Sequence, residues 1–140
     1  MFESTGWILN EPAHNHLGDK YDLEALTVVK PPKNQITKEK QKEISEIGIV
    51  QQYQFSSTLQ RMSVIIQISD SKEFKAYTKG SPEMILTLSK PETVPAGINI
   101  TLQKYTEQGY RVIALGSSEI NVKASQVHFC NYEKNLFYTI

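Results

Sequence analysis

Residues 49–79, IVQQYQFSSTLQRMSVIIQISDSKEFKAYTK, carry the clearest strand pattern in the sequence. Much of this stretch alternates between apolar and polar residues, which is typical of β-strands with one buried face. Short links rich in Ser, Thr, Asp and Lys separate the runs, and such links allow neighbouring strands to run antiparallel. The stretch therefore predicts an antiparallel meander with strands at 49–55, 61–68 and 74–79.

Helices and further strands are expected on both sides of this meander. Ser81-Pro82-Glu83 is a helix-start signature, because Ser caps free N–H groups, Pro fits the first helical position and Glu complements the helix dipole. A second helix is predicted from Ile98 to Gln108, with Gly109 directly after its end. The remaining strands are expected within 1–9, within 23–29, as a buried strand at 110–115, and as a weak strand at 127–130.

Composition limits the class of protein. The 140 residues suggest one domain, and 15 Lys and Arg balance 15 Asp and Glu, which argues against a broad nucleic-acid surface. With 39% hydrophobic and 21% charged residues, the chain is predicted to be a soluble folded domain rather than a disordered segment. Its apolar runs, such as Val64-Ile65-Ile66, are far shorter than a membrane span, and no secretory signal opens it.

Several standard catalytic and metal-binding devices are missing from the sequence. It contains no phosphate-binding P-loop, no dinucleotide fingerprint and no nucleophile elbow. His14 and His16 lie near Asp19, but no further ligand is evident, so an ordinary polar loop is favoured over a metal site. Cys130 has no neighbouring base or cation and is read as a plain thiol rather than a nucleophile.

Three places combine residue types that could bind an anionic, aromatic ligand. Phe55 lies where a strand breaks into a polar loop and could stack a nucleobase, or could be a core residue. Lys79-Gly80 joins a strand to a helix start, which is either an anion-friendly junction or a plain turn. Arg111 opens the predicted last strand and could hold a phosphate or pair with a surface carboxylate.

These places fall within three ordered motifs that resemble the nucleotide-binding (N) domain of P-type ATPases. The motifs are residues 55–64, FSSTLQRMSV, residues 79–83, KGSPE, and residues 109–115, GYRVIAL. The opening MFESTGW at 1–7 and the segment PETVP at 91–95 are similar to type V members, subfamily B. The resemblance covers about residues 1–116, so the nucleotide-binding domain is predicted there, and 117–140 is expected to be a divergent tail.

The resemblance implies an α+β fold, a twisted antiparallel sheet of about six strands flanked by helices. It implies that Phe55 stacks adenine, that Lys79 lies at the nucleotide beside Gly80, and that Arg111 reaches the phosphates. Gln60 stands where many relatives carry a lysine, with Arg61 next to it, and both are included in the expected nucleotide site. The family's Asp-Lys-Thr-Gly phosphorylation motif does not occur in the chain.

The function expected from the resemblance is ATP binding and presentation to a phosphorylation domain that this chain does not contain. The phosphorylation and actuator domains of a parent pump are the expected protein partners, and Mg²⁺ is expected mainly through the phosphorylation domain. Polyamine transport at the cytosolic face of an endosomal or lysosomal membrane is implied, with no nucleic-acid partner. The alternatives are a non-nucleotide interaction module with the same fold, and a small hydrolase, which no nucleophile–base pair supports.

Overall fold

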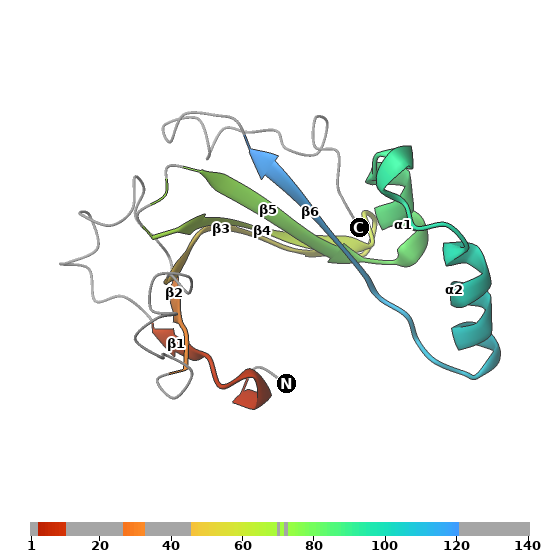
Figure 1. Ribbon diagram of the computed structural model, residues 1–140, viewed down its shortest axis with the longest axis horizontal. Coiled ribbons are helices and arrows are strands. Elements are labelled where there is room, and N and C mark those ends of the chain that lie inside the picture. The colour runs from red at the N-terminus through yellow and green to blue at the C-terminus, as the bar shows by residue number, and fades with distance from the viewer. Residues whose placement is uncertain (1–2, 11–26, 33–45, 70, 72, 121–140) are drawn as a thin grey trace. The chain divides into compact units, whose positions relative to one another are not determined.

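The computed structural model describes residues 3–10, 27–32, 46–69, 71 and 73–120 (Figure 1). From β3 onward three strands follow one another, then the helices, and then a last strand. The strands are β1 (Ile8–Asn10), β2 (Thr27–Lys30), β3 (Ile47–Ser56), β4 (Arg61–Ile68), β5 (Phe74–Gly80) and β6 (Ala114–Ile120). The α-helices are α1 (Pro82–Leu88) and α2 (Ile98–Glu107), and the short 3₁₀ helices are η1 (Glu3–Thr5) and η3 (Pro91–Thr93).

The strands form one six-stranded sheet in the order β1-β2-β3-β4-β5-β6, so each strand lies beside its sequence neighbour. Strands β1 and β2 pair antiparallel with Ile8 opposite Lys30, and β2 pairs antiparallel with β3 with Val28 opposite Gly48. The links at 57–60 and 69–73 are short enough for tight connections between β3, β4 and β5, whereas longer segments connect the other strands. The predicted α+β fold with an antiparallel sheet of about six strands is confirmed.

The described residues divide into two compact units, and strands β3, β4 and β5 contribute residues to both. Unit 1 holds the described residues among 1–52 and 65–75, and its buried side chains include Val28, Val50, Ile65 and Phe74. Unit 2 holds residues 53–64 and 76–120. Its buried side chains include Ala76, Thr78, Ile85 and Ile120.

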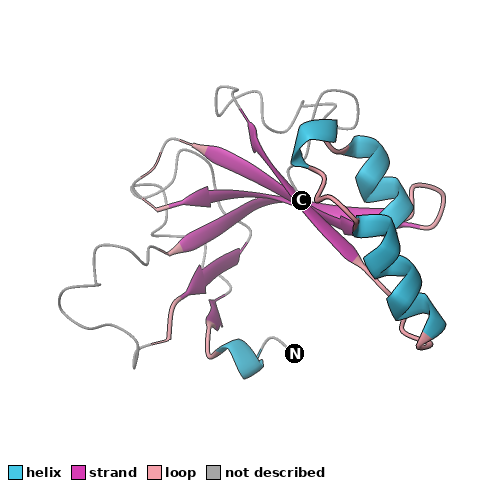
Figure 2. Cartoon of the chain, turned by 45° about the vertical axis from the view of Figure 1, so that its right-hand side comes forward, coloured by secondary structure: helices cyan, strands magenta, loops and turns pink. Residues whose placement is uncertain are grey.

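Within unit 2, the two helices follow β5 in the chain, and Figure 2 shows helices, in cyan, in front of one end of the magenta strands. Helix α1 contacts β6 and buries Pro82 and Ile85. Helix α2 buries none of its residues, although Leu102 is half-buried. The helix predicted at 98–108 is therefore confirmed as α2. Of the two described α-helices, α1 is the one with buried residues.

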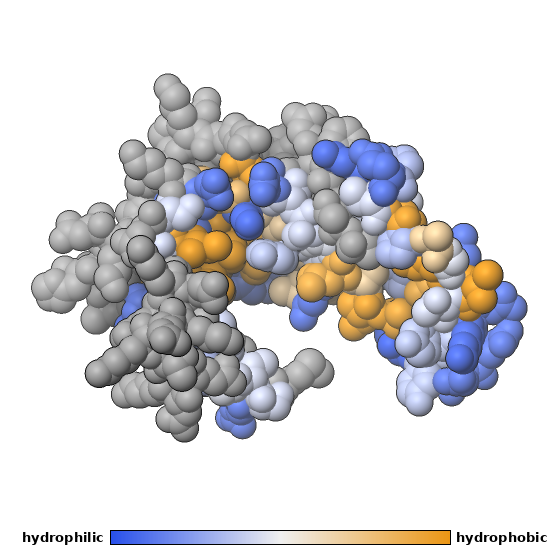
Figure 3. Space-filling model, in the orientation of Figure 1, coloured by the Kyte–Doolittle hydropathy of each residue, from blue (hydrophilic) through white to orange (hydrophobic). Residues whose placement is uncertain are grey.

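One sequence-based strand prediction is wrong in its placement. The segment 110–115 was expected to be a buried strand, but β6 begins at Ala114, and Tyr110, Ile113 and Leu115 are 63%, 65% and 59% exposed. The physical reason is that residues 110–113 lie outside the sheet, in the irregular segment between α2 and β6, so no strand alternation turns them toward a core. Leu115 lies on the face of β6 opposite to the buried Gly116 and Ile120. Figure 3 shows apolar surface, in orange, near the start of β6.

Other expectations fall partly or wholly outside the described residues. The weak strand predicted at 127–130, the histidines at 14 and 16 and Cys130 belong to this group, as does the first half of the strand predicted at 23–29. The proposed boundary after residue 116 stays a prediction, and β6 runs across it to Ile120. Among the described residues, no helix is long and apolar enough to cross a membrane.

Candidate functional site

Unit 2 contains a cavity of about 310 Å³, here called the Phe55 pocket. Its walls come from the end of β3, the β3–β4 turn, the start of β4, the end of β5 and the segment just before β6. The lining residues are Phe55, Ser57, Gln60, Met62, Lys79, Gly80, Ser81, Arg111, Val112 and Ile113. Five of the six residues predicted as a nucleotide site therefore line one cavity.

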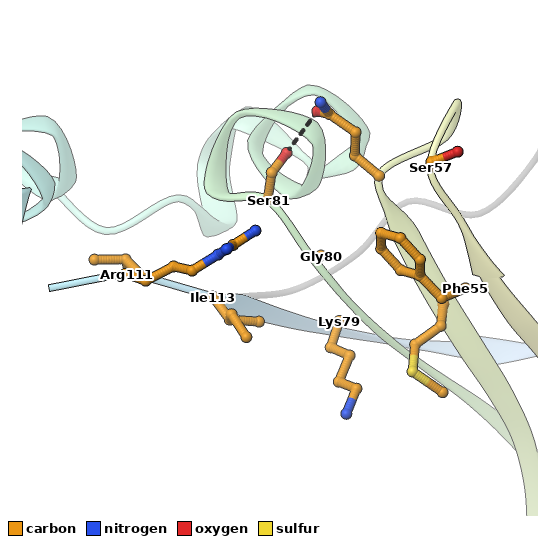
Figure 4. A pocket seen from close by; sticks show the side chains of 10 residues that line it. Phe55, Ser57, Lys79, Gly80, Ser81, Arg111 and Ile113 are labelled. Atoms are coloured by element: carbon orange, nitrogen blue, oxygen red, sulfur yellow. Dashed lines mark hydrogen bonds between the residues drawn. The ribbon is translucent and has the colours of Figure 1, made fainter.

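Phe55 lies near the end of β3 and leaves 63% of its surface exposed (Figure 4). An aromatic ring that stays in water forgoes the free energy that burial in the core would supply. The alternative reading of Phe55 as a core residue is therefore wrong. The exposed ring offers a flat apolar face to whatever enters the pocket.

Lys79 reaches the pocket because of the alternation of side chains along β5. Phe74, Ala76 and Thr78 are buried on one face of the strand, whereas Lys79 is exposed on the other. The Thr78 hydroxyl bonds to the Ser63 hydroxyl of β4 at 2.7 Å on the buried face, which fixes the facing of both strands. Met62 precedes Ser63 in β4, so its side chain lies on the opposite face of the sheet from Ser63. On that face Met62 and Lys79 both line the pocket.

Gly80 is required by close packing of backbone against backbone. A Cβ atom at this position would lie 2.5 Å from the Gln60 carbonyl oxygen and 3.0 Å from the Arg61 Cβ. The β3–β4 turn therefore packs directly against Gly80, and the place of Gly80 beside the nucleotide stays a prediction. Only a residue without a side chain lets the turn come this near.

Ser81 links that turn to helix α1. Its Oγ accepts the Met84 N–H at 3.3 Å, which confirms the N-cap predicted from the sequence. The same hydroxyl donates to Gln60 Oε1 at 3.2 Å, the bond drawn in Figure 4, and the Ser81 N–H donates to the Gln60 carbonyl at 3.1 Å. Helix start and hairpin turn are therefore joined at one residue.

Arg111 enters the pocket from an irregular segment that follows α2. Helix α2 ends in a Schellman motif, in which Tyr110 N–H donates to the Tyr105 carbonyl at 3.0 Å and Gly109 N–H donates to the Thr106 carbonyl at 2.9 Å. Gly109 supplies the left-handed backbone with a φ of 80°, as predicted for the residue after the helix. Figure 4 shows Arg111 and Phe55 on opposite sides of Gly80.

Arg61 is the predicted site residue that does not line the pocket. Its guanidinium Nη1 donates to the Met84 sulfur at 3.5 Å, so it packs toward helix α1. The sequence reasoning missed four lining residues, Ser57, Met62, Val112 and Ile113, and it identified Ser81 only as a helix cap. Each of them lies within or beside a quoted motif, so reading whole motifs rather than single residues would have included them.

The charged side chains among the lining residues are positive. Lys79 and Arg111 are the cationic side chains among the lining residues, and no acidic side chain lines the pocket in the part of the chain that the structure describes. The same residues hold no cluster of three or more His, Cys, Asp or Glu that could bind a metal. The pocket thus combines an exposed ring with two cations, which suits a ligand with an aromatic base and an anionic group.

Comparisons with known proteins show what the chain is similar to. The family model of the P-type ATPase cytoplasmic domain N matches residues 10–139. The chain is 41% identical over 134 residues to polyamine-transporting ATPase 13A3 of Macaca fascicularis and of Homo sapiens, covering 88% of this chain and 11% of each relative. It is 39% identical over 123 residues to human polyamine-transporting ATPase 13A2, covering 86% of this chain and 10% of that protein.

Proposed function

The chain belongs to the P-type ATPase family, as a cytoplasmic N domain of the 13A (type V) group, and on this basis we propose that it binds ATP and presents it to a separate phosphorylation domain. The chain spans about 11% of the length of the relatives that it matches. Presentation to another domain suits this size, because phosphoryl transfer depends on several parts that position the nucleotide and stabilise charge.

The observation that carries the proposal is the exposed Phe55 ring in a cavity that also holds Lys79 and Arg111. In the proposed complex, adenine stacks on Phe55, and Lys79 and Arg111 attract the phosphates. Stacking of a base on an aromatic side chain contributes about 1–3 kcal/mol in single-strand systems. Arg can donate two parallel hydrogen bonds to phosphate oxygens, whereas Lys acts as a point charge.

The other predicted site residues have supporting places in this proposal. Gln60 and Gly80 line the pocket, and Arg61 lies next to Gln60 and packs toward helix α1 through its contact with Met84. Since no acidic side chain lines the pocket among the described residues, we propose that Mg²⁺ is held mainly by the phosphorylation domain.

For the parent protein we propose a membrane pump with phosphorylation and actuator domains as partners of this chain. The relatives named as polyamine-transporting ATPases support polyamines as the transported substrate. We propose the cytosolic face of an endosomal or lysosomal membrane as its location, on the basis of the resemblance to subfamily B.

The test is a titration of the 140-residue chain with ATP and with adenosine, followed by backbone amide shifts, for the wild type and Phe55→Ala. We expect shifts at Phe55, Lys79 and Arg111, and a loss of about fivefold or more in affinity for both ligands in the variant, because the lost contact is to the base. Leu115→Ala is the matched control, since Leu115 is a similarly exposed apolar side chain on β6 that does not line the pocket.

The same titration distinguishes nucleotide binding from the alternative function. A folded wild-type chain that shows no shifts with either ligand would favour a non-nucleotide interaction module. If folded Phe55→Ala binds both ligands as tightly as the wild type, Phe55 is not part of the nucleotide site, although the chain still binds ATP.

A further inference from the structure

The β3–β4 turn is fixed against the start of helix α1 at three points, all of which involve Gln60. The Ser81 N–H donates to the Gln60 carbonyl, the Ser81 hydroxyl donates to Gln60 Oε1, and Gly80 leaves no room for a side chain under the Gln60 carbonyl. We infer that Gln60 is a positioning residue, which holds the turn on Gly80–Ser81 and thereby sets the place of the Phe55 ring relative to Lys79 and Arg111. This inference rests on the proposed nucleotide site.

Gln60 and Phe55 lie at the two ends of a short turn, which a hydrogen bond closes. Residues 57–60 form the turn, and Leu59 N–H donates to the Ser56 Oγ at 3.3 Å, so the turn closes on the residue next to Phe55. A turn that moved away from Ser81 would carry the end of β3 with it. The ring is therefore positioned by the contact at the other end of the turn.

The backbone of Gln60 supports the same conclusion. Its φ of 51° lies in the left-handed region, which glycine and asparagine adopt more readily than glutamine. A glutamine there accepts an unfavourable backbone conformation, and its amide reaches Ser81 from that conformation. The glutamine side chain thus accepts a hydrogen bond from Ser81 that glycine at this position could not accept.

The Ser81 hydroxyl makes the link directional. Because its oxygen already accepts the Met84 N–H, its own hydrogen is available for the Gln60 amide oxygen. Loss of the Gln60 amide would leave the helix cap in place and remove only the side-chain bond between the turn and Ser81. A substitution at residue 60 can therefore test positioning without removing the cap.

The experiment compares Gln60→Met with Gln60→Glu in the 140-residue chain. Methionine keeps the length of the side chain but lacks the acceptor, whereas glutamate keeps an acceptor for the Ser81 hydroxyl. We expect Gln60→Met to weaken adenosine binding about twofold to tenfold, the range of one neutral hydrogen bond, and ATP binding by the same factor. Gln60→Glu should retain adenosine binding, since an uncharged ligand does not report the added charge.

Two further measurements connect the effect to Ser81. In a Ser81→Ala background, Gln60→Met should cause no additional loss, because the bond is already gone. Without ligand, the Phe55 ring resonances and the Ser81 amide resonance should move in Gln60→Met and return in Gln60→Glu. Gln103→Met is the matched control, because Gln103 makes a side-chain bond to Glu107 at 2.8 Å on α2 and does not line the pocket.

Each outcome distinguishes the inference from the function on which it rests. A wild-type chain that binds neither ligand refutes the proposed function. Binding by the wild type together with unchanged adenosine affinity in Gln60→Met, or with additive losses in the Ser81→Ala background, overturns the positioning role alone. A loss confined to ATP would show that Gln60 acts at the phosphates directly.

Discussion

Lys79 and Arg111 reach the Phe55 pocket from different kinds of backbone. Lys79 stands on β5, where the strand's alternation fixes its direction, whereas Arg111 follows the end of α2 in a segment without regular structure. Both side chains are exposed, so neither contributes a buried charge to the fold. Their substitution should therefore change ligand binding more than stability.

Arg111→Ala and Lys79→Ala should each lower the affinity for ATP more than the affinity for adenosine. The reason is that charge-assisted hydrogen bonds to phosphate strengthen with ligand charge, and salt screens them at an exposed site. Dissociation constants of both ligands at two salt concentrations measure this, and the difference between ATP and adenosine should shrink at high salt. Lys104→Ala on α2 is the control, because Lys104 is exposed and does not line the pocket.

Equal losses for ATP and adenosine that do not depend on salt would contradict the phosphate role of either cation. A large loss of stability with intact binding would instead identify a residue that supports the fold.

Gly80→Ala should destabilise the chain through a steric clash. The added methyl group would lie 2.5 Å from the Gln60 carbonyl oxygen, and backbone atoms cannot move aside as a flexible side chain can. Overpacking of this kind costs about 1–3 kcal/mol, which urea denaturation measures as a lower free energy of unfolding. An unchanged free energy of unfolding would show that the turn does not rest on Gly80 in solution.

At the scale of elements, the end of α2 decides where Arg111 begins its path to the pocket. The Schellman bonds reverse the chain at Gly109, and Tyr110 packs edge-on against Tyr105 with ring centroids 6.1 Å apart. This contact between the residues that flank the motif commonly accompanies it. The motif thus fixes the direction of the segment 110–113, which carries Arg111.

Gly109→Ala should lower both stability and ATP affinity. A Cβ at Gly109 meets no atom within 4 Å, so the cost of about 1–2 kcal/mol comes from the left-handed φ of 80° alone. Gly97 offers a matched control, since its φ is 78° and its Cβ would also meet nothing within 4 Å, but it lies at the start of α2.

Thermal unfolding and ATP titration measure both glycine variants. We expect Gly97→Ala to lose similar stability and to keep its ATP affinity. Equal ATP affinities in the two variants would show that the helix end does not position Arg111.

At the scale of the whole molecule, the chain should bind ATP without hydrolysing it. In the proposed function the phosphoryl group passes to a separate domain, and the Asp-Lys-Thr-Gly motif that accepts it in the family does not occur in this sequence. Phosphate release from ATP and Mg²⁺ should stay at the level of buffer alone, under conditions where the titration shows binding. Turnover that Phe55→Ala abolishes would contradict this expectation.

Local chemistry made much of the fold predictable. The strands β3 to β5 follow from alternation, the start of α1 from Ser81-Pro82, and the end of α2 from Gly109, because these signals act between residues close in sequence. The exposure of residues 110–115 was not predictable in this way. Apolar residues are buried only where a strand or helix places them against a core, and residues 110–113 lie outside β6 in an irregular segment.

The fold class, the family and the residue types of the proposed site follow from the sequence, since ordered motifs and periodicity are properties of the chain. The exposure of Phe55, the packing of Arg61 toward Met84 and the contact of Gln60 and Gly80 with Ser81 became known from the three-dimensional structure. These facts depend on distances between residues about twenty positions apart. Such distances are set by how strands and turns pack together, which no local pattern specifies.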